Sequence, residues 1–228
     1  MNASPGKVET ALFATGFAMA GLMLLAVLWS GRAAYEDMAR ANGVDQTTLL
    51  AHVPGGGTYT TDRNGLVAIH ERWSTYVTGG VADAPRFEPT LFTEDEYSHM
   101  ADVRRVFDGG KILIPAGLFV MAIRLQRARS RSAATMFRLI RDGAITAGVA
   151  VAVVGIIAAV AFDAAFLLFH QIFFPQGNFL FDPATSNLLR LYPDWYWQGI
   201  TLRIGLSFIG LAAAVTVAAA VGLRRALH

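Results

Sequence analysis

Apolar residues gather in blocks along this chain, and three of the blocks contain no charged residue. They cover residues 11–30, 143–162 and 204–223. Each block reaches the length of about 20 residues with which a helix crosses the hydrocarbon core of a bilayer. A fourth block, 112–123, is shorter, but Lys111 and Arg124 flank it and could extend toward opposite head-group layers. The pattern therefore predicts four membrane spans.

The second span is predicted to continue a helix that begins outside the membrane, because the preceding residues HMADVRRVF are also typical of a helix. The predicted spans are, in order, about 11–30, 108–124, 143–163 and 203–223. The predicted fold class is a mostly α integral membrane protein with four transmembrane helices. A small mixed α/β extracytoplasmic segment, 31–107, is expected between the first and second helices.

Composition agrees with a membrane protein. The chain is 54% hydrophobic and 16% charged, whereas a soluble domain has about 25% charged residues. There is no cysteine, which excludes disulfides, thiolate metal sites and a cysteine nucleophile. The net charge of +2 gives no indication of nucleic-acid binding, and no nucleic-acid partner is expected.

The distribution of arginine predicts the orientation of the spans. Residues 124–142 contain six Arg and one Asp, whereas 31–107 contain seven Arg and eleven acidic residues. Residues 166–198 contain one Arg and two Asp and are rich in aromatic residues. By the positive-inside rule, the basic loop 125–142 and both termini are cytoplasmic, and the aromatic loop 166–198 is extracytoplasmic. No A-x-A site follows the first span, so an uncleaved signal anchor is expected.

Local signals predict the elements of the segment 31–107. We expect a helix over 32–41, a second helix beginning near Asp45, a glycine-rich turn at 55–57, and short strands over 66–73 and 86–92. Thr93 and Glu96 have the spacing of a capping box. This spacing predicts that a helix begins just before His99.

Histidines are the first candidates for chemistry. His52 and His70 are expected to be solvated, and His228 belongs to the cytoplasmic tail. His99 begins the long second helix and His170 follows the third span, so the predicted topology brings both to the outer membrane boundary. This convergence makes the pair the main candidate site.

His170 lies in the sequence FLLFHQIFF, where an imidazole needs a partner or a task. Burying an unpaired polar group costs about 2–7 kcal/mol. One interpretation is a core histidine that bonds to a neighbouring carbonyl group. The other is a catalytic group at the edge of the membrane, and these nine residues do not decide between them.

Charged residues near the pair leave alternatives open. Asp102 lies three residues after His99 on the same helical face and could orient its imidazole, or it could pair with Arg104 or Arg105. Arg203, at the outer end of the fourth span, is a functional candidate by its position, although a structural ion pair is an equal alternative. The sequence contains neither a G-x-S-x-G nor an H-E-x-x-H motif. General acid–base chemistry is therefore expected, with a nucleophile that the substrate supplies.

Two stretches of the chain resemble a known family. YSHMADVRRVF, residues 97–107, and FHQIFFPQGNFLFDPATSNLLRLYPDWYW, residues 169–197, are similar to signature blocks of the bacterial lipoprotein intramolecular transacylases. The family's two catalytic histidines correspond to His99 and His170. This chain departs from the family pattern at Phe179, where Trp is frequent, and at Ser186, where an acidic residue is frequent. The supporting or substrate-positioning candidates are Asp102, Asp182, Arg203 and Trp195.

The resemblance implies an acyl shift in the bacterial cell membrane without a metal or another cofactor. The sn-2 acyl chain of a diacylglyceryl-cysteine lipoprotein would move to the α-amine of the cysteine and give a lyso-form lipoprotein. The expected partners are diacylated lipoproteins and membrane lipid, and the active site would face the extracytoplasmic side. Three alternatives stay open: a membrane acyl hydrolase or other lipid-modifying enzyme with the same histidine pair, a non-catalytic lipoprotein-binding protein, and a haem- or metal-binding membrane protein.

Overall fold

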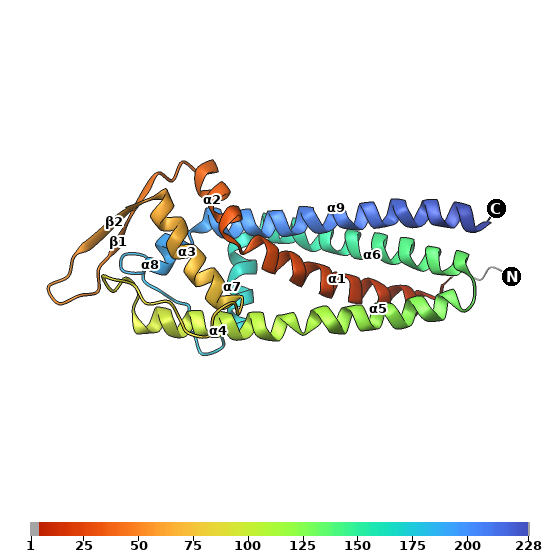
Figure 1. Ribbon diagram of the computed structural model, residues 1–228, viewed down its shortest axis with the longest axis horizontal. Coiled ribbons are helices and arrows are strands. Elements are labelled where there is room, and N and C mark those ends of the chain that lie inside the picture. The colour runs from red at the N-terminus through yellow and green to blue at the C-terminus, as the bar shows by residue number, and fades with distance from the viewer. Residues whose placement is uncertain (1–4, 228) are drawn as a thin grey trace. The chain divides into compact units, whose positions relative to one another are not determined.

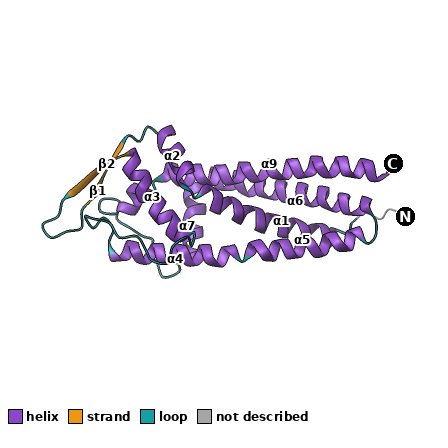
Figure 2. Cartoon of the chain, in the orientation of Figure 1, coloured by secondary structure: helices purple, strands orange, loops and turns teal. Residues whose placement is uncertain are grey.

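The computed structural model describes residues 5–227 and consists mostly of helices (Figures 1 and 2). The helices are α1 (Lys7–Trp29), α2 (Arg32–Ala41), α3 (Arg63–Val77), α4 (Glu94–Lys111), α5 (Leu113–Arg129), α6 (Ala133–Val160), α7 (Phe162–Phe173), α8 (Asn187–Leu191) and α9 (Asp194–Leu227). The strands are β1 (Gln46–Leu50) and β2 (Thr58–Asp62). The chain divides into two compact units, which are described separately below.

The first unit contains the described parts of residues 1–26, 110–160 and 202–228. Helices α1, α5, α6 and most of α9 lie side by side in it (Figure 1). Their buried core is formed by Phe13, Ala14, Phe17, Ala128, Leu139, Ala144, Ala147, Phe208 and Ala212. Small side chains at many of these positions allow the helix backbones to come close together, as is typical of packing within a membrane.

Helices α1 and α5 approach each other closely through two glycines. A Cβ atom added at Gly117 would lie 2.4 Å from the carbonyl oxygen of Gly16, and one added at Gly16 would lie 2.8 Å from the carbonyl oxygen of Gly117. Backbone atoms cannot move aside as a flexible side chain can. Only glycine at both positions therefore permits this crossing.

Within residues 5–227, four helical segments are long and apolar enough to cross a membrane. They are Lys7–Trp29, Glu94–Arg129, Ala133–Val160 and Asp194–Leu227. The predicted class, a mostly helical protein with four candidate spans and a small sheet, is confirmed. The second segment has 36 residues, or about 54 Å at 1.5 Å per residue. It therefore exceeds a bilayer core, in agreement with the expected long helix.

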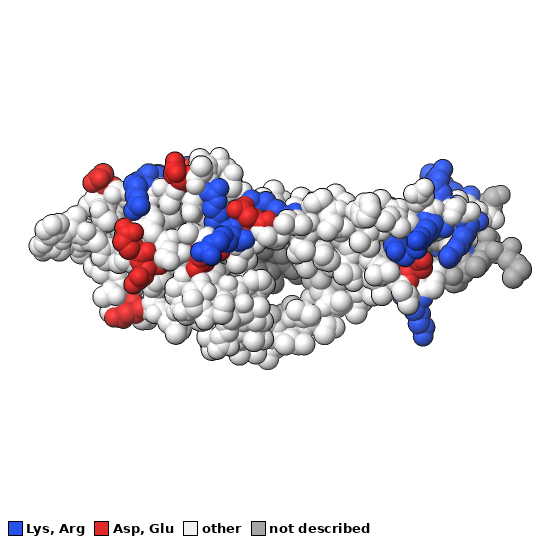
Figure 3. All heavy atoms as spheres, turned by 90° about the horizontal axis from the view of Figure 1, so that it is seen from below, with Lys and Arg blue, Asp and Glu red and all other residues white. Residues whose placement is uncertain are grey.

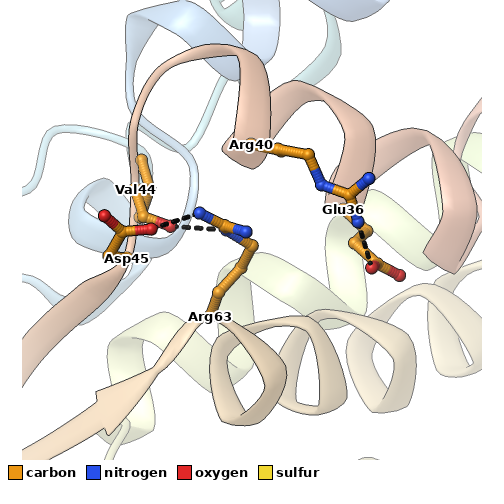
Figure 4. Close-up of polar contacts among 5 residues, drawn as sticks. All are labelled: Glu36, Arg40, Val44, Asp45 and Arg63. Atoms are coloured by element: carbon orange, nitrogen blue, oxygen red, sulfur yellow. Dashed lines mark hydrogen bonds and ion pairs between the residues drawn. The ribbon is translucent and has the colours of Figure 1, made fainter.

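The second unit contains residues 27–109 and 161–201. Strands β1 and β2 form an antiparallel hairpin in the register Gln46↔Asp62 to Leu50↔Thr58. At its base, Arg63 donates from Nε to the carbonyl oxygen of Val44 at 2.8 Å and pairs with Asp45 (Figure 4). Nearby, Arg40 and Glu36 form an ion pair within α2 at 3.0 Å. The contacts of Arg63 hold the residues just before β1 beside the beginning of α3.

Aromatic side chains form the core of the second unit. The fully buried Trp73 of α3 lies 5.2 Å from Phe92 and 5.2 Å from Tyr97, measured between ring centroids. A second cluster surrounds His70, whose ring stacks on Tyr35 at 4.1 Å. The apolar residues of this unit thus gather around α3, which carries both Trp73 and His70.

Several local predictions are confirmed. The helix over 32–41 is present as α2. The capping box is also formed, because Thr93 N donates to Glu96 Oε2 at 2.9 Å and Glu96 N donates to Thr93 Oγ1 at 3.2 Å. Helix α4 accordingly begins at Glu94.

Three other local predictions are wrong. The helix expected near Asp45 is the strand β1, which pairs with the threonine-rich β2 across the glycine turn. The strand expected over 66–73 belongs to helix α3, because Asp62 accepts a hydrogen bond from Gly65 N at 2.9 Å and caps the helix. Residues 86–92 form no strand; Phe87 and Phe92 pack instead against Trp73.

Candidate active site

Two imidazoles from distant parts of the sequence lie together in the second unit. His99 is in α4 and His170 is in α7, and their ring centroids are 6.1 Å apart with an angle of 16° between the ring planes. Their exposed fractions are 8% and 7%. The rings are too far apart for a direct hydrogen bond, which requires about 3 Å between heavy atoms. They are close enough for one small polar group to reach both.

Helix α7 is unusual because its one buried residue, His170, is polar. His170 is buried, whereas Leu168, Ile172 and Phe173 are 56%, 62% and 48% exposed. Apart from Phe166, which packs on the imidazole, this helix turns few apolar side chains into the protein. Its apolar side chains are therefore available to lipid, and the imidazole is held on the opposite side.

The hydrogen bonding of His170 determines its tautomer. Its Nδ1 lies 2.8 Å from the carbonyl oxygen of Phe166, one turn earlier in α7. A carbonyl oxygen only accepts, so Nδ1 carries the hydrogen, and in the neutral ring Nε2 carries the free lone pair. Burial also lowers the pKa of His170 below its ordinary value, an effect that the Phe166 carbonyl partly opposes. His170 is therefore a neutral base near pH 7.

His99 has a buried ring nitrogen, Nδ1, without a hydrogen-bond partner among residues 5–227. The surrounding groups are largely aromatic, with Phe174 at 4.8 Å and Phe181 at 5.6 Å between centroids. Because an unpaired buried nitrogen is costly, a polar atom of a ligand is the natural partner for Nδ1.

Phenylalanine rings surround the imidazole of His170. The ring centroids of Phe166, Phe179 and Phe174 are 4.2, 5.0 and 5.3 Å from that of His170. Trp197 extends this aromatic wall, because its ring lies 5.4 Å from Phe166. The pair is thus surrounded by apolar groups, which keep water away.

Asp102 bonds to groups other than the imidazole. Within residues 5–227 its carboxylate accepts hydrogen bonds from Asn178 Nδ2 at 2.6 Å, from Gln176 Nε2 and from Arg105. The ion pair with Arg105, one of the two alternatives from the sequence, is therefore present. The two amides come from the segment that follows α7, which Asp102 ties to α4.

The other predicted supporting residues have contacts away from the two imidazoles. Asp182 is exposed and accepts from Ala184 N at 2.9 Å, so it shapes a turn. Trp195 is half-buried against Tyr35 at 5.7 Å. Arg203 is part of the first unit and so lies outside the unit that holds the two imidazoles.

The remaining histidines differ from the expectation of solvated side chains. His70 is 1% exposed, and its ring nitrogens lie 3.1 Å from the carbonyl oxygen of Ser30 and 3.3 Å from Tyr192 Oη. The prediction of a solvated His70 is therefore wrong, because the helix α3 turns it into the aromatic cluster. His52 is half-buried, and His228 lies outside the described residues.

Sequence reasoning missed three polar or aromatic neighbours of the pair. Gln176 and Asn178 lie more than 70 residues from Asp102 in the chain, so no local pattern connects them. Trp197, rather than Trp195, joins the aromatic wall. Within the described residues, no group of three or more His, Asp or Glu side chains could hold a metal ion.

Comparisons with known proteins support a family and a fold. The family profile described as lipoprotein intramolecular transacylase Lit matches residues 12–197. The lipoprotein intramolecular transacylase Lit from Bacillus cereus, solved in meso as an integral membrane protein, has a TM-score of 0.75 at 13% identity and covers 96% of each chain. A histidine-to-alanine variant of that protein has a TM-score of 0.71 at 13% identity, covering 96% of this chain and 94% of that one. A search of curated proteins gives no match.

Proposed function

This chain belongs to the lipoprotein intramolecular transacylase family, a family of membrane acyltransferases, and we propose that it moves an acyl chain within a diacylglyceryl-cysteine lipoprotein. The chain at the glycerol sn-2 oxygen is transferred to the α-amine of the lipidated cysteine. The product is an N-acyl, S-monoacylglyceryl lipoprotein of unchanged composition. The observation that carries this proposal is the meeting of His99 and His170 at 6.1 Å.

The reaction needs one bond made, one bond broken and one proton moved. The amine nitrogen attacks the ester carbonyl carbon, and the bond from that carbon to the glycerol oxygen breaks. The amine loses a proton and the glycerol oxygen gains one, so the atoms balance without a co-reactant. Both proton transfers suit an imidazole, which titrates near neutral pH.

The two rings are suited to different parts of this reaction. His170 offers a lone pair at Nε2, because Nδ1 is held by the Phe166 carbonyl. It accepts the amine proton and later returns it to the leaving glycerol oxygen. His99 has an unpartnered buried Nδ1, which in its protonated tautomer donates to the carbonyl oxygen as negative charge develops there. A preorganised donor of this kind contributes about 2.7–4 kcal/mol to catalysis.

The surrounding apolar wall supplies the third contribution, which is geometry. The path from the amine nitrogen through Cα, Cβ, sulfur, two glycerol carbons and the ester oxygen to the carbonyl carbon closes a ring of eight atoms. A flexible chain seldom adopts such a ring, so holding both ends removes much of the entropic barrier. The phenylalanines around His170 hold the acyl chain, and the exposed apolar side of α7 faces the lipid from which it arrives.

The charge distribution of the first unit supports a cytoplasmic position for its basic end. Lys and Arg side chains gather where the α5–α6 connection and the last turns of α9 lie (Figure 3). The exposed arginines of this end are Arg127, Arg129, Arg131, Arg224 and Arg225. By the positive-inside rule this end faces the cytoplasm, and the histidine pair then acts at the extracytoplasmic side.

The test is expression in a bacterial host that accumulates diacyl lipoproteins, followed by mass spectrometry of the N-terminal lipopeptides. We expect a peptide isomeric with the diacyl precursor that carries an amide-linked acyl chain. His99→Ala and His170→Ala should each abolish it. His52→Ala, a half-buried histidine outside the pair, is the matched control and should retain it.

Other outcomes would assign a different function. Loss of one acyl chain from the peptide would indicate a hydrolase that uses water in place of the amine. Unmodified diacyl peptide with protein correctly inserted in the membrane would contradict the proposal. Full activity of both histidine variants would also contradict it, because the reaction would then not depend on the pair.

A further inference from the structure

Helix α4 carries three buried polar side chains at intervals of three residues. Glu96, His99 and Asp102 are 1%, 8% and 4% exposed. Residues three apart lie on the same side of a helix. The imidazole of His99 therefore lies between two buried carboxylates along one face.

Glu96 holds the far end of the segment that follows α7. Its Oε1 accepts from Ser186 Oγ at 2.7 Å and from Leu188 N at 2.8 Å. Next to them, the fully buried Asn187 accepts from Leu50 N at 2.9 Å and donates to the carbonyl oxygen of Leu50 at 2.8 Å. This end is enclosed by protein, and its polar groups are paired.

Asp102 holds the near end of the same segment in a different environment. Its partners Asn178 and Gln176 bond through neutral amides. Gln176 and Gly177 are exposed, and Gly177 has the positive φ of 78° that marks a turn. Arg105, the third partner, is 77% exposed at its side chain. Both carboxylates are buried, but the partners of Asp102 reach the protein surface, whereas those of Glu96 are enclosed.

Between the two ends, the segment carries aromatic rings to the imidazoles. Phe179 lies 5.0 Å from His170, and Phe181 lies 5.6 Å from His99. Leu180, between them, is 75% exposed. Residues 176–188 thus pass by both imidazoles and are tied to α4 on either side of His99. We call these residues the strap.

We propose that the strap opens at Asp102 to admit the diacylated N-terminus and closes over the transferred acyl chain with Phe179 and Phe181. Asp102, Gln176 and Asn178 are then positioning residues that act through the strap, and Glu96 is its fixed anchor. The inference rests on the proposed function, because the acyl chain is the ligand that the strap covers. It assigns to Asp102 a role in holding the strap rather than in orienting the His99 ring.

The first test measures initial rates against the concentration of a synthetic diacylated lipopeptide in detergent micelles. Gln176→Ala should raise KM about tenfold, as expected for the loss of about 1.4 kcal/mol of closure energy, and leave kcat within about twofold. Asp95→Asn, at an exposed acidic residue of the same helix, is the control and should match the wild type. An unchanged KM would overturn the proposal.

The second test fixes the strap in place. The chain has no cysteine, so the double variant Arg105→Cys, Gln176→Cys carries two thiols and no others. They replace two of the side chains that bond to Asp102, one in α4 and one in the strap. Bridging the pair with a short bismaleimide should lower the rate at least tenfold relative to the same protein capped with N-ethylmaleimide. Equal rates for bridged and capped protein would show that opening at Asp102 is not needed.

The histidine variants separate failure of the strap from failure of the reaction. Inactive His99→Ala and His170→Ala, together with strap variants that match Asp95→Asn, would reject the strap alone. Active histidine variants would reject the proposed function, whatever the strap variants do.

Discussion

Stability of this protein should fall as the pH decreases from 6.5 to 4 because of His70. The ring stacks on Tyr35 and is enclosed by Tyr192 and Tyr196, and burial lowers the pKa of His70 from 6.5 to about 4. The unfolded chain therefore binds the proton more readily than the folded one in this range. The stabilisation is complete above pH 6.5 and is lost as the pH falls through the folded-state value.

The expected size follows from the gap between the two pKa values. At 1.36 kcal/mol per pKa unit, the gap between 6.5 and about 4 corresponds to about 3 kcal/mol of unfolding free energy. For a chain of this length, 1 kcal/mol changes Tm by about 2–4 °C. The contribution of His70 to the fall in Tm between pH 7 and pH 4 is thus about 6–12 °C.

The assay is thermal unfolding of detergent-solubilised protein, followed by circular dichroism at several pH values. His70→Phe is the comparison variant, because it keeps an aromatic ring on Tyr35 and cannot titrate. The variant loses the bonds to Ser30 and Tyr192, so its Tm at pH 7 should be lower than that of the wild type. Between pH 7 and pH 4, however, the Tm of the variant should fall by about 6–12 °C less. Parallel pH profiles of the two proteins would refute the reasoning.

Three further predictions concern other parts of the chain. Glu96→Gln should lower the unfolding free energy by about 1–3 kcal/mol, because an amide NH2 group, which donates, replaces one of the two acceptor oxygens of the buried carboxylate. An unchanged Tm would contradict the role of Glu96 as anchor. Gly117→Ala should lower the Tm of the protein, because its Cβ meets Gly16 O at 2.4 Å, whereas Gly155→Ala, with open space around its Cβ, should not. The rate on diacylated lipopeptide should fall at acidic pH as His170 Nε2 becomes protonated, and the fall should lie below pH 6.5 because burial lowers the pKa of His170; a fall centred above pH 6.5 would contradict its assignment as the base.

The fold could be predicted from sequence where hydrophobicity or a local hydrogen bond alone determines the structure. Uninterrupted apolar stretches have few alternatives to a membrane span, so the four candidate spans follow from composition and length. The capping box at Thr93 is equally local, because its partners are three residues apart. The prediction of α2 over 32–41 also required only its own residues.

Errors arose where packing decides between similar patterns. The window 66–73 is too short to distinguish the 3.6-residue period of a helix from the two-residue period of a strand. Over the whole of α3, however, the buried positions Leu66, Ile69, His70 and Trp73 follow the helical period. The hairpin could have been recognised from its threonine-rich runs on both sides of Gly55–57. No comparable signal exists for residues 86–92, whose conformation depends on the distant Trp73.

The candidate site shows the same division. His99 and His170 could be singled out because topology and family resemblance converge on them, and their roles as catalytic residues stay a prediction. The spacing of Glu96, His99 and Asp102 is visible in the sequence, but its meaning depends on the strap. The amides of Gln176 and Asn178 could not be foreseen, because amides in an exposed turn give no sign of the carboxylate that they reach.

The group that orients His170 is a main-chain carbonyl, and this affects how the site tolerates substitutions at position 166. Every amino acid at position 166 supplies the same acceptor as long as α7 remains helical. Leucine or methionine in place of Phe166 would thus alter the fit of the lipid and preserve the protonation pattern of the ring. Substrate preference can diverge at this position without loss of the proton acceptor.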